Sequence, residues 1–435
     1  MNKTSVIILA AGKGTRMKSK LPKVLHEIAG KPIIIHVIDA CKKLKLDNIY
    51  VVLNENSKNI KKILPKKTKI IIQKKQLGTA NALMATKTEL EKYTGNLLVL
   101  YGDVPFIKAT TLKKLLRQSK NTLNLLGFYA DNPKGYGRII KKNNKIFRVI
   151  EEKDADAKIR KIDFCNSGIF CSPGKVLFNL LKKIVISKSS KEFLLTDIFQ
   201  LAYEKQLAGN VITVDEEEVI GINDKYQLAI AESKYQNLLR KNFLEKGVTI
   251  VSPETVIFSH DTKISSDVFI GAFCFFGKKV IIKKGVKIDN NCSIEETTVN
   301  EDSSLGPFCR LRNANFIGKR VKIGNFVELK NSYIGNNTKI SHLAYIGDAT
   351  IGTNTNIGAG TITCNYDGKK KNNTKIGNDV FIGSNCSLIA PINIANNCFV
   401  AAGSTISKNL LNEDFSIARA RQQIVRKGRN KFLKS

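Results

Sequence analysis

Hydrophobic positions in the first half of the chain form short apolar runs separated by helical patterns. The apolar runs are typical of buried strands and cover residues 5–9, 48–53, 69–73, 96–101 and 123–129. Patterns with the helical period lie between them, at 32–43, 57–64, 79–90 and 110–119. This alternation predicts an α/β domain with a mostly parallel sheet, helices on both faces and a ligand site outside the carboxyl ends of the strands.

After Gly247 the hydrophobic period changes to six residues. That period fits neither an amphipathic helix nor an array of hairpins, and it is typical of the hexapeptide repeats of a parallel β-helix. Each hexad then supplies one short strand whose apolar side chain points into a prism-shaped core. Glycine often follows that residue, and we expect it to let the corner backbone avoid a Cβ clash. The recurring positions are Ile264, Ile270, Phe276, Ile282, Ile288, Ile294, Val299, Leu305, Leu311, Ile317, Ile323, Leu329, Ile334, Ile340, Ile346, Ile351, Ile357, Ile376, Ile382, Leu388, Ile394, Val400 and Ile406.

These patterns predict the domain boundaries. The α/β domain covers residues 1–223, a connecting helix 224–247, the hexapeptide-repeat domain 248–418 and a C-terminal tail 419–435. The long interruption of the repeat at 358–375 is expected to leave the coil as a loop, and such insertions often carry function.

Composition excludes several classes of protein. With 43% hydrophobic and 25% charged residues, the chain of 435 residues is not disordered throughout. No apolar run approaches the roughly 18 residues of a membrane span, so we expect no integral membrane protein. The nine cysteines include no Cys-x-x-Cys pair, which argues against a disulfide framework or a zinc knuckle. We therefore expect a cytoplasmic protein.

The formal net charge of +34 raises the possibility of nucleic-acid binding. However, most of the basic residues are lysines, and the chain is also rich in Asn and Ile, residues that share A/T-rich codons with Lys. No Arg-rich recognition helix is present. We therefore interpret the charge as compositional drift and expect no specific nucleic-acid partner; the basic tail is expected to be a mobile or surface-docked end.

A glycine-rich segment directly follows the first predicted strand. It reads Leu9-Ala10-Ala11-Gly12-Lys13-Gly14-Thr15-Arg16-Met17, and Leu21-Pro22-Lys23 comes shortly after it. Its small residues let backbone N–H groups approach a phosphate chain, and Arg16 and Lys23 can neutralise charge on transferring phosphoryl oxygens. The spacing matches neither the Walker A loop nor the dinucleotide fingerprint. The alternative is an ordinary strand-to-helix turn.

Asp103 follows the predicted strand 96–101, at the edge where such sheets bind ligands. A carboxylate there suits Mg²⁺, which takes oxygen ligands together with substrate phosphates. The alternative is a turn-forming Gly-Asp pair.

Together with these segments, further motifs carry a family resemblance. They are Gln73, Gln76-Leu77-Gly78-Thr79-Ala80, Leu100-Tyr101-Gly102-Asp103-Val104-Pro105, Gly135-Tyr136-Gly137-Arg138, Glu151-Glu152-Lys153-Asp154, Asn166-Ser167-Gly168 and Gly221-Ile222-Asn223. The first half resembles the nucleotidyltransferases that make nucleotide sugars. With its hexapeptide repeats, the whole chain resembles the bifunctional N-acetylglucosamine-1-phosphate uridyltransferase/glucosamine-1-phosphate N-acetyltransferase family.

The resemblance implies a Rossmann-like nucleotidyltransferase domain followed by a left-handed parallel β-helix, in a homotrimer with acetyltransferase sites between subunits. It implies that Asp103 and Asn223 hold Mg²⁺, that Gln73, Gly78 and Thr79 lie near uracil, and that Gly137, Glu151 and Asn166 contact the sugar. The residues it implies for UTP and UDP-N-acetylglucosamine are Leu9, Ala10, Ala11, Gly12, Lys23, Gln73, Gly78, Thr79, Tyr101, Gly102, Asp103, Gly137, Glu151, Asn166 and Asn223. Ala80-Asn81 departs from the Gly-His common in the family.

The second group of candidate residues lies among the hexapeptide repeats. A lone histidine is usually structural, but the resemblance makes His342 the general base that deprotonates the glucosamine amine, with Glu328 a candidate to orient it. The resemblance further implies that Arg312 and Lys330 bind the sugar phosphate and that Tyr345 and Asn356 contact the sugar. It implies contacts with acetyl-CoA or the neighbouring substrate from Ala359, Asn365, Tyr366, Ser384, Ala402 and Arg419. Asn313 and Ala420-Arg421 depart from the family pattern.

The expected function is therefore a two-reaction enzyme. Glucosamine 1-phosphate is acetylated with acetyl-CoA, and UMP is then transferred from UTP to the product with Mg²⁺ and release of pyrophosphate. One alternative is a single-activity nucleotidyltransferase, for instance one making ADP-glucose, with a purely structural β-helix. A metal hydrase would need three histidines on zinc, and the repeats offer only His260 and His342. A basic scaffold for nucleic acid is the non-enzyme alternative.

Overall fold

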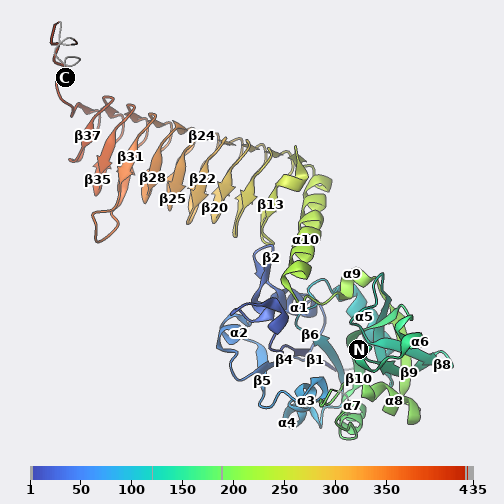
Figure 1. Ribbon diagram of the computed structural model, residues 1–435. Helices are drawn as coiled ribbons and strands as arrows, with labels where there is room; N and C mark the ends of the chain where they lie inside the picture. Colours follow the sequence, from blue (N-terminus) through green and yellow to red (C-terminus); the bar gives the residue numbers. More distant parts are fainter. Residues whose placement is uncertain (1–2, 120, 188–189, 427–428, 430–435) are drawn as a thin grey trace. The chain divides into compact units, whose positions relative to one another are not determined.

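The computed structural model describes residues 3–119, 121–187, 190–426 and 429 (Figure 1). The chain divides into an N-terminal unit, Met1–Glu232, and a C-terminal unit, Ser233–Ser435. The boundary lies inside helix α10 (Lys225–Glu245), which the sequence predicts at 224–247. Among the described residues, no helix is both long enough and apolar enough to cross a membrane.

A twisted sheet forms the centre of the N-terminal unit, with strand order β11-β7-β10-β6-β1-β4-β5. Neighbouring strands are parallel throughout the stretch β6-β1-β4-β5, and β11 is parallel to β7. β10 runs antiparallel to both β6 and β7, and β8 and β9 form an antiparallel pair beside it. The strands are β1 (Thr4–Leu9), β4 (Asn48–Asn54), β5 (Thr68–Gln73), β6 (Asn96–Tyr101), β7 (Leu123–Tyr129), β8 (Arg138–Lys142), β9 (Lys145–Ile150), β10 (Phe164–Pro173) and β11 (Ala208–Thr213).

Helices cover both faces of this sheet, as the alternation predicts, and each face has its own buried core. Val37 of α1 and Leu112 of α5 pack in one core, and Leu83 of α3, Phe178 of α7 and Phe199 of α8 pack in the other. The predicted helix 79–90 is two helices, α3 and α4. The helices are α1 (Ile33–Lys42), α2 (Lys58–Ile63), α3 (Thr79–Met84), α4 (Lys87–Leu90), α5 (Ala109–Gln118), α6 (Ala157–Arg160), α7 (Gly174–Leu181), α8 (Asp197–Glu204) and α9 (Glu216–Val219).

The C-terminal unit is a left-handed parallel β-helix whose short strands stack into three sheets (Figure 1). The first sheet contains β12 (Thr249–Ile250), β15 (Phe269–Ile270), β18 (Lys287–Ile288), β21 (Ser304–Leu305), β24 (Lys322–Asn325), β27 (Lys339–His342), β30 (Asn356–Ile357), β33 (Phe381–Ile382), β36 (Phe399–Val400) and β38 (Phe415–Ser416). The second contains β13 (Ile257–Phe258), β16 (Phe275–Phe276), β19 (Ser293–Ile294), β22 (Arg310–Arg312), β25 (Glu328–Lys330), β28 (Tyr345–Gly347), β31 (Ile362–Cys364), β34 (Ser387–Ile389) and β37 (Thr405–Ile406). The third contains β14 (Lys263–Ile264), β17 (Ile281–Ile282), β20 (Thr297–Val299), β23 (Asn315–Ile317), β26 (Tyr333–Ile334), β29 (Ala349–Ile351), β32 (Thr374–Ile376) and β35 (Ile392–Ile394).

Every predicted hexad position, from Ile264 to Ile406, is buried in one continuous core. Equivalent residues of successive coils pair in register, for example Ile270 with Ile288. This packing confirms the six-residue period as the pattern that specifies the β-helix.

The glycines of the repeats allow close approach between coils. A Cβ at Gly335 would lie 2.5 Å from the Gly352 carbonyl carbon, and one at Gly324 would meet the Ser341 carbonyl oxygen. The left-handed corner conformations are mostly taken by other residues, such as Asn291, Asn337 and Asn354. The Cβ clash that we expected therefore comes from the neighbouring coil.

The interruption at 358–375 is shorter than predicted. Residues 362–364 remain in the coil as β31, which pairs with β28 and β34. The core position that would hold an aliphatic residue is occupied by the fully buried Thr363, whose hydroxyl accepts from Gly347 N at 2.8 Å. Because this core position holds threonine and not an aliphatic residue, the hydrophobic pattern did not predict the hexad that contains β31. The chain leaves the coil only from Asn365 and rejoins it at β32.

Candidate active sites

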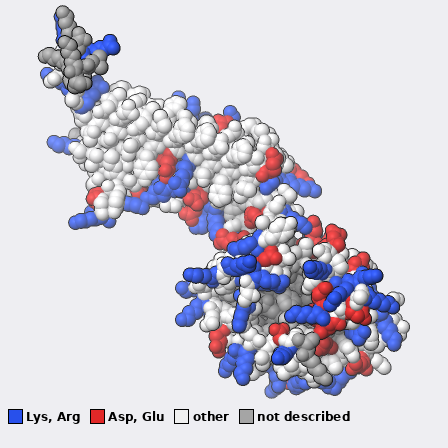
Figure 2. Space-filling view, viewed as in Figure 1, with Lys and Arg blue, Asp and Glu red and all other residues white. Residues whose placement is uncertain are grey.

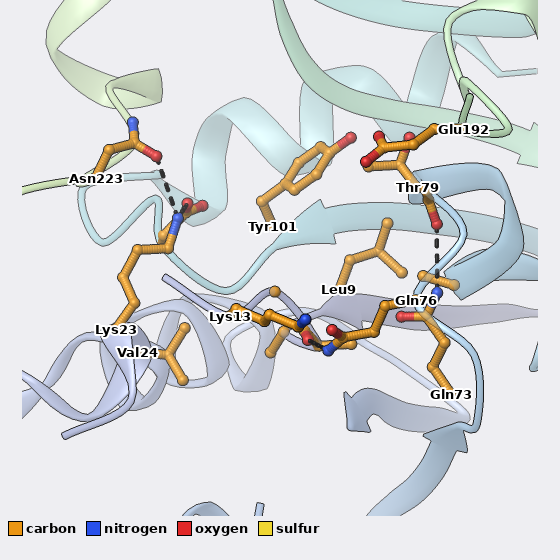
Figure 3. A pocket seen from close by; sticks show the side chains of 16 residues that line it. Leu9, Lys13, Lys23, Val24, Gln73, Gln76, Thr79, Tyr101, Glu192 and Asn223 are labelled. Atoms are coloured by element: carbon orange, nitrogen blue, oxygen red, sulfur yellow. Dashed lines mark hydrogen bonds and ion pairs between the residues drawn. The ribbon is translucent and has the colours of Figure 1, made fainter. Parts of the chain in front are cut away.

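A cavity of about 540 Å³ opens beside the carboxyl ends of β1, β5 and β6 (Figure 3). This is the sheet edge where the α/β pattern predicts a ligand. The predicted nucleotide-contacting residues that line it are Leu9, Ala10, Ala11, Gly12, Lys23, Gln73, Gly78, Thr79, Tyr101, Asp103 and Asn223. Predicted Gly102 lies directly behind the wall, where its N–H donates to Leu9 O at 2.9 Å.

Two cationic side chains meet two oxygen-bearing side chains at one end of the cavity. Lys23 Nζ forms an ion pair with Asp103 Oδ2 and donates to Asn223 Oδ1 at 3.2 Å. Arg16 Nη2 donates to the same Asn223 oxygen at 2.8 Å. The Lys23 and Asp103 side chains are each 16% exposed, so solvent screens this pair less than a surface pair. The structure thus brings the predicted catalytic cations and the predicted metal ligands into one network.

Backbone hydrogen bonds hold the two oxygen-bearing residues side by side. Ile222 N donates to Asp103 O at 3.0 Å, which ties the segment before α10 to the end of β6. Asn223 N donates to Gln227 Oε1 at 2.7 Å, and Asn223 Nδ2 donates to Gly221 O at 3.3 Å. Because its amide nitrogen is engaged, Asn223 presents its oxygen to the cations, as Figure 3 shows for Lys23.

This arrangement fits a hard divalent cation. Asp103 and Asn223 both direct an oxygen at one cationic nitrogen, so the pair already forms a point where positive charge is stabilised. Mg²⁺ prefers oxygen ligands and is usually bound through one or two carboxylates plus substrate phosphates and water. Among the described residues, no cluster of three or more His, Cys, Asp or Glu side chains could hold a metal ion. Two oxygen-bearing side chains leave positions on such a cation for substrate phosphates and water.

The opposite wall of the cavity is formed by Gln73, Gly78 and Thr79. Gly78 has a φ of +104°, and a Cβ there would lie 2.6 Å from Phe193 O, so glycine is required. Thr79 Oγ1 accepts from Leu195 N at 3.1 Å. These contacts fix the wall that the family resemblance places near a nucleobase.

The predicted sugar-contacting residues form a second cluster. Asn166 N donates to Gly137 O at 2.8 Å, and a Cβ on Gly137 would lie 3.6 Å from Glu151 Oε2. Glu151 Oε1 accepts from Thr196 Oγ1 at 3.0 Å. Burial raises the pKa of Glu151 despite that hydrogen bond, and burial together with the Glu151 charge raises the pKa of Tyr101. Tyr101 therefore links this cluster to the cavity that it lines.

The cavity also contains residues that the sequence analysis did not assign to a site. They are Lys13, Val24, Gln76, Ala82 and Glu192. Lys13 and Gln76 belong to the motifs quoted above, and Gln76 Nε2 donates to Ala11 O at 2.7 Å. Glu192 comes from a segment without a motif and reaches the cavity because its neighbour Phe193 packs on Gly78. No local sequence signal indicates it.

In the β-helix, one corner carries a column of predicted residues. His342, Ala359, Ser384 and Ala402 each lie two positions after a core residue of the first sheet. Backbone bonds connect consecutive coils along this corner, from Gly360 N to His342 O, from Asn385 N to Ala359 O and from Gly403 N to Ser384 O. Arg419 Nη1 donates to Ala402 O at 2.8 Å and extends the column. The tail beyond residue 426, except Arg429, lies outside the described residues.

His342 is exposed, and its Nδ1 lies 2.6 Å from Asn325 Oδ1 of the preceding coil. The prediction that Glu328 orients this ring does not match the contacts. Glu328 Oε1 accepts from Arg312 Nε at 2.6 Å and lies 3.9 Å from Arg310 Nη1. The two arginines of β22 thus attract the Glu328 carboxylate, and the partner of the His342 ring is Asn325, which was not predicted.

A second corner follows strands β25, β28 and β31 and is rich in charge. Arg312 and Lys330 pair on neighbouring coils, and Lys330 Nζ lies 3.5 Å from Asp348 Oδ2. Asn365 Nδ2 donates to the same oxygen at 2.6 Å, and Asn331 Nδ2 donates to Asp348 Oδ1 at 2.8 Å. Burial opposes ionisation of Asp348, but these amides and the Lys330 charge hold its pKa below its usual range. Asp348 was not predicted as a site residue. It contacts two residues that were, Lys330 and Asn365, and fixes their positions.

The remaining predicted residues lie near the two corners. Tyr345 begins β28 and pairs with Glu328 between the corners, whereas Asn356 begins β30 and pairs with Lys339 of the first sheet. Tyr366 is exposed on the loop after β31, where its hydroxyl donates to Gly368 O at 2.8 Å. Within this unit, the candidate base His342 lies at one edge of the second sheet, and the phosphate-binding candidates Arg312 and Lys330 lie at its other edge.

Comparisons with known proteins agree with this architecture. A family described as "MobA-like NTP transferase domain" matches residues 6–164. "Bacterial transferase hexapeptide (six repeats)" matches 373–408, and "Hexapeptide repeat of succinyl-transferase" matches 267–295. The chain is similar to the bifunctional protein GlmU of Zymomonas mobilis, with 42% identity over 96% of this chain and 95% of that protein. The GlmU proteins of Thermosipho africanus (43% identity; 97% and 96% covered) and of Acinetobacter baumannii strain AYE (41%; 96% and 96%) are similar over comparable lengths.

Proposed function

The chain belongs to the family of bifunctional GlmU proteins and is a transferase with uridyltransferase and acetyltransferase activities, and we propose that its two units divide these reactions. The β-helix unit acetylates glucosamine 1-phosphate with acetyl-CoA. The N-terminal unit then transfers UMP from UTP to N-acetylglucosamine 1-phosphate and releases pyrophosphate. The observation that carries the proposal is one hydrogen-bonded network in which Lys23, Asp103 and Asn223 line the cavity and Arg16 donates to Asn223. We place both reactions in the cytoplasm.

In the uridyl transfer, a phosphate oxygen of the sugar 1-phosphate attacks the α-phosphorus of UTP. Asp103 and Asn223 would hold Mg²⁺, which supplies positive charge to the triphosphate when bound. Lys23 and Arg16 neutralise the charge that develops on the transferring phosphoryl oxygens. Glu151, Asn166 and Gly137 hold the sugar, so the attacking oxygen is positioned by contacts away from the reacting bond.

In the acetyl transfer, the amine of glucosamine 1-phosphate attacks the thioester carbonyl of acetyl-CoA. His342 takes the proton that the amine loses, and the thiolate of coenzyme A leaves. Asn325 Oδ1 accepts from a protonated Nδ1 of His342, which leaves Nε2 with the lone pair of a base. Arg312 and Lys330 bind the substrate phosphate, while Ser384, Ala402 and Arg419 contact acetyl-CoA.

We further propose that the protein is a homotrimer. Exposed aromatic rings stack between coils of the β-helix, with centroids 5.2 Å apart for Phe308 and Phe326 and 4.7 Å apart for Phe381 and Phe399. Phe326 is 55% exposed. Apolar surface of this kind on a repeat protein favours burial against another copy of the chain.

The experiment that tests the division compares two variants in separate assays of the two reactions. Asp103→Ala should abolish uridyl transfer and leave acetyl transfer at its normal rate, and His342→Ala should do the reverse. The two sites lie in different units, so each variant serves as the folding control for the other. Loss of both activities in either folded variant would contradict the proposal.

A further inference from the structure

Asn81 lies in the first turn of α3, directly behind the nucleobase wall of the N-terminal cavity. It is half-buried, and its Oδ1 accepts a hydrogen bond from Gln73 Nε2 at 2.9 Å. Gln73 ends β5, lines the cavity and is 4% exposed. The two residues come from different elements, so this contact couples the helix to the side chain that faces the nucleotide.

The orientation of the Gln73 amide follows from its second partner. Gln73 also contacts Gly78 O at 3.3 Å, and a backbone carbonyl can only accept. The atom facing Gly78 must therefore be Nε2, and the Asn81 atom facing the same nitrogen must be its oxygen. The orientations of both side-chain amides follow from the heavy-atom contacts alone.

Gln73 consequently offers the cavity only an acceptor. Its Nε2 carries two hydrogens, and both are used by Asn81 and Gly78. Its Oε1 is turned toward the interior of the pocket (Figure 3), and no donor contacts it among the described residues. A fixed acceptor suits a base whose ring nitrogen carries a hydrogen.

We propose that Asn81 is a positioning residue that sets nucleobase specificity by locking the Gln73 amide with its oxygen toward the base. Uracil and thymine both carry a hydrogen on N3 and can donate it to this oxygen. Cytosine has a lone pair on N3, which the oxygen repels, and must shift to place its amino group there instead. A buried acceptor left without a donor discriminates against the wrong ligand. The inference rests on the proposed uridyl transfer.

The test measures kcat/KM of the full-length protein with UTP, CTP and dTTP in the uridyl-transfer assay. Asn81→Ala removes the shorter of the two bonds and lets the amide rotate, so the preference for UTP over CTP should fall roughly 3- to 10-fold. The preference for UTP over dTTP should not change, because both bases present the same N3 hydrogen. Asn81→Asp keeps an acceptor at the same place and should retain both preferences.

Three results would overturn the inference while leaving the proposed function intact. They are an unchanged UTP/CTP ratio in Asn81→Ala, equal changes of the UTP/CTP and UTP/dTTP ratios, and an Asn81→Asp variant that loses the ratio as fully as Asn81→Ala. If Asn81→Ala does not fold, as judged by thermal unfolding, Asn81→Leu removes the same acceptor while keeping the branched shape and should give the same ratios. Absence of uridyl transfer in the unmodified protein would instead overturn the proposed function, and this inference with it.

Discussion

Glu151 is a half-buried carboxyl group in the cluster of predicted sugar-contacting residues, and its ionised form is costly to the folded state. Burial raises its pKa, although Thr196 donates a hydrogen bond to it. An acid whose pKa is raised in the folded state binds its proton more tightly there than in the unfolded chain. The resulting penalty is fully present above the folded pKa and disappears below the unfolded pKa.

Glu151→Gln should therefore stabilise the protein at neutral pH and impair the uridyl transfer, because a neutral amide avoids the half-buried charge and loses the proposed sugar contact. The stability gain should be about 1 kcal/mol and should shrink as the pH falls toward the unfolded pKa of a glutamate. Thermal unfolding of both proteins across this pH range measures it. A gain that is constant with pH would show that ionisation of Glu151 is not its cause.

Some residue contacts could be predicted from the sequence and others could not. Lys23 and Asp103 were predicted because each lies in a motif that follows a predicted strand, whereas Asn223 was predicted from the family resemblance. Asn325 was missed although a simple rule finds it. One coil here is 17 residues, so the partner of His342 in the preceding coil is residue 325. Glu192 has no such rule, because a turn far along the chain brings it to the cavity.

Among the elements, strands with strong periodicity were predicted best. β6 and β7 begin and end where the apolar runs predict, and the hexads of the β-helix hold throughout. The antiparallel strands β8, β9 and β10 were not predicted, because they do not alternate with helices as the parallel strands do. β31 was missed for a chemical reason, because its core position holds Thr363 and not an aliphatic residue.

Thr363 gives a direct test of how β31 is held in the coil. Its hydroxyl accepts from Gly347 N at 2.8 Å and lies 3.1 Å from Gly347 O. Thr363→Val keeps the shape but leaves the buried Gly347 N–H unpaired, so we expect a loss of about 1–3 kcal/mol. Urea unfolding measures the loss, and hydrogen exchange at the Gly347 amide should quicken.

The matched control is Thr350→Val, a change of the same chemistry at an exposed position of β29. It should alter stability by less than about 0.5 kcal/mol. Equal effects of the two substitutions would mean that the Thr363 hydroxyl does not hold β31.

The net charge of +34 is a property of the whole molecule and follows directly from the sequence. It does not arise from any single site. Figure 2 shows lysines and arginines dispersed over the N-terminal unit and interleaved with acidic residues on the face in view. That distribution differs from the basic stripe of a nucleic-acid groove. Its physical consequence is a general positive field, which raises the encounter rate of anions and is screened within about 8 Å at physiological ionic strength.

The substrates proposed here, UTP, sugar phosphates and acetyl-CoA, are all anions, so their capture should depend on salt. Raising the ionic strength from about 0.02 to about 0.2 M should lower kcat/KM for acetyl-CoA several-fold and leave kcat nearly unchanged, since screening weakens the encounter but not the chemistry of bound substrate. Steady-state kinetics across this range measures both constants. An acetyl thioester of pantetheine provides the control, because it lacks the nucleotide phosphates and should show little salt dependence. If the charged and uncharged donors lost kcat/KM equally, the salt would be acting on the protein rather than on the attraction between enzyme and substrate, and the charge would have no part in catalysis.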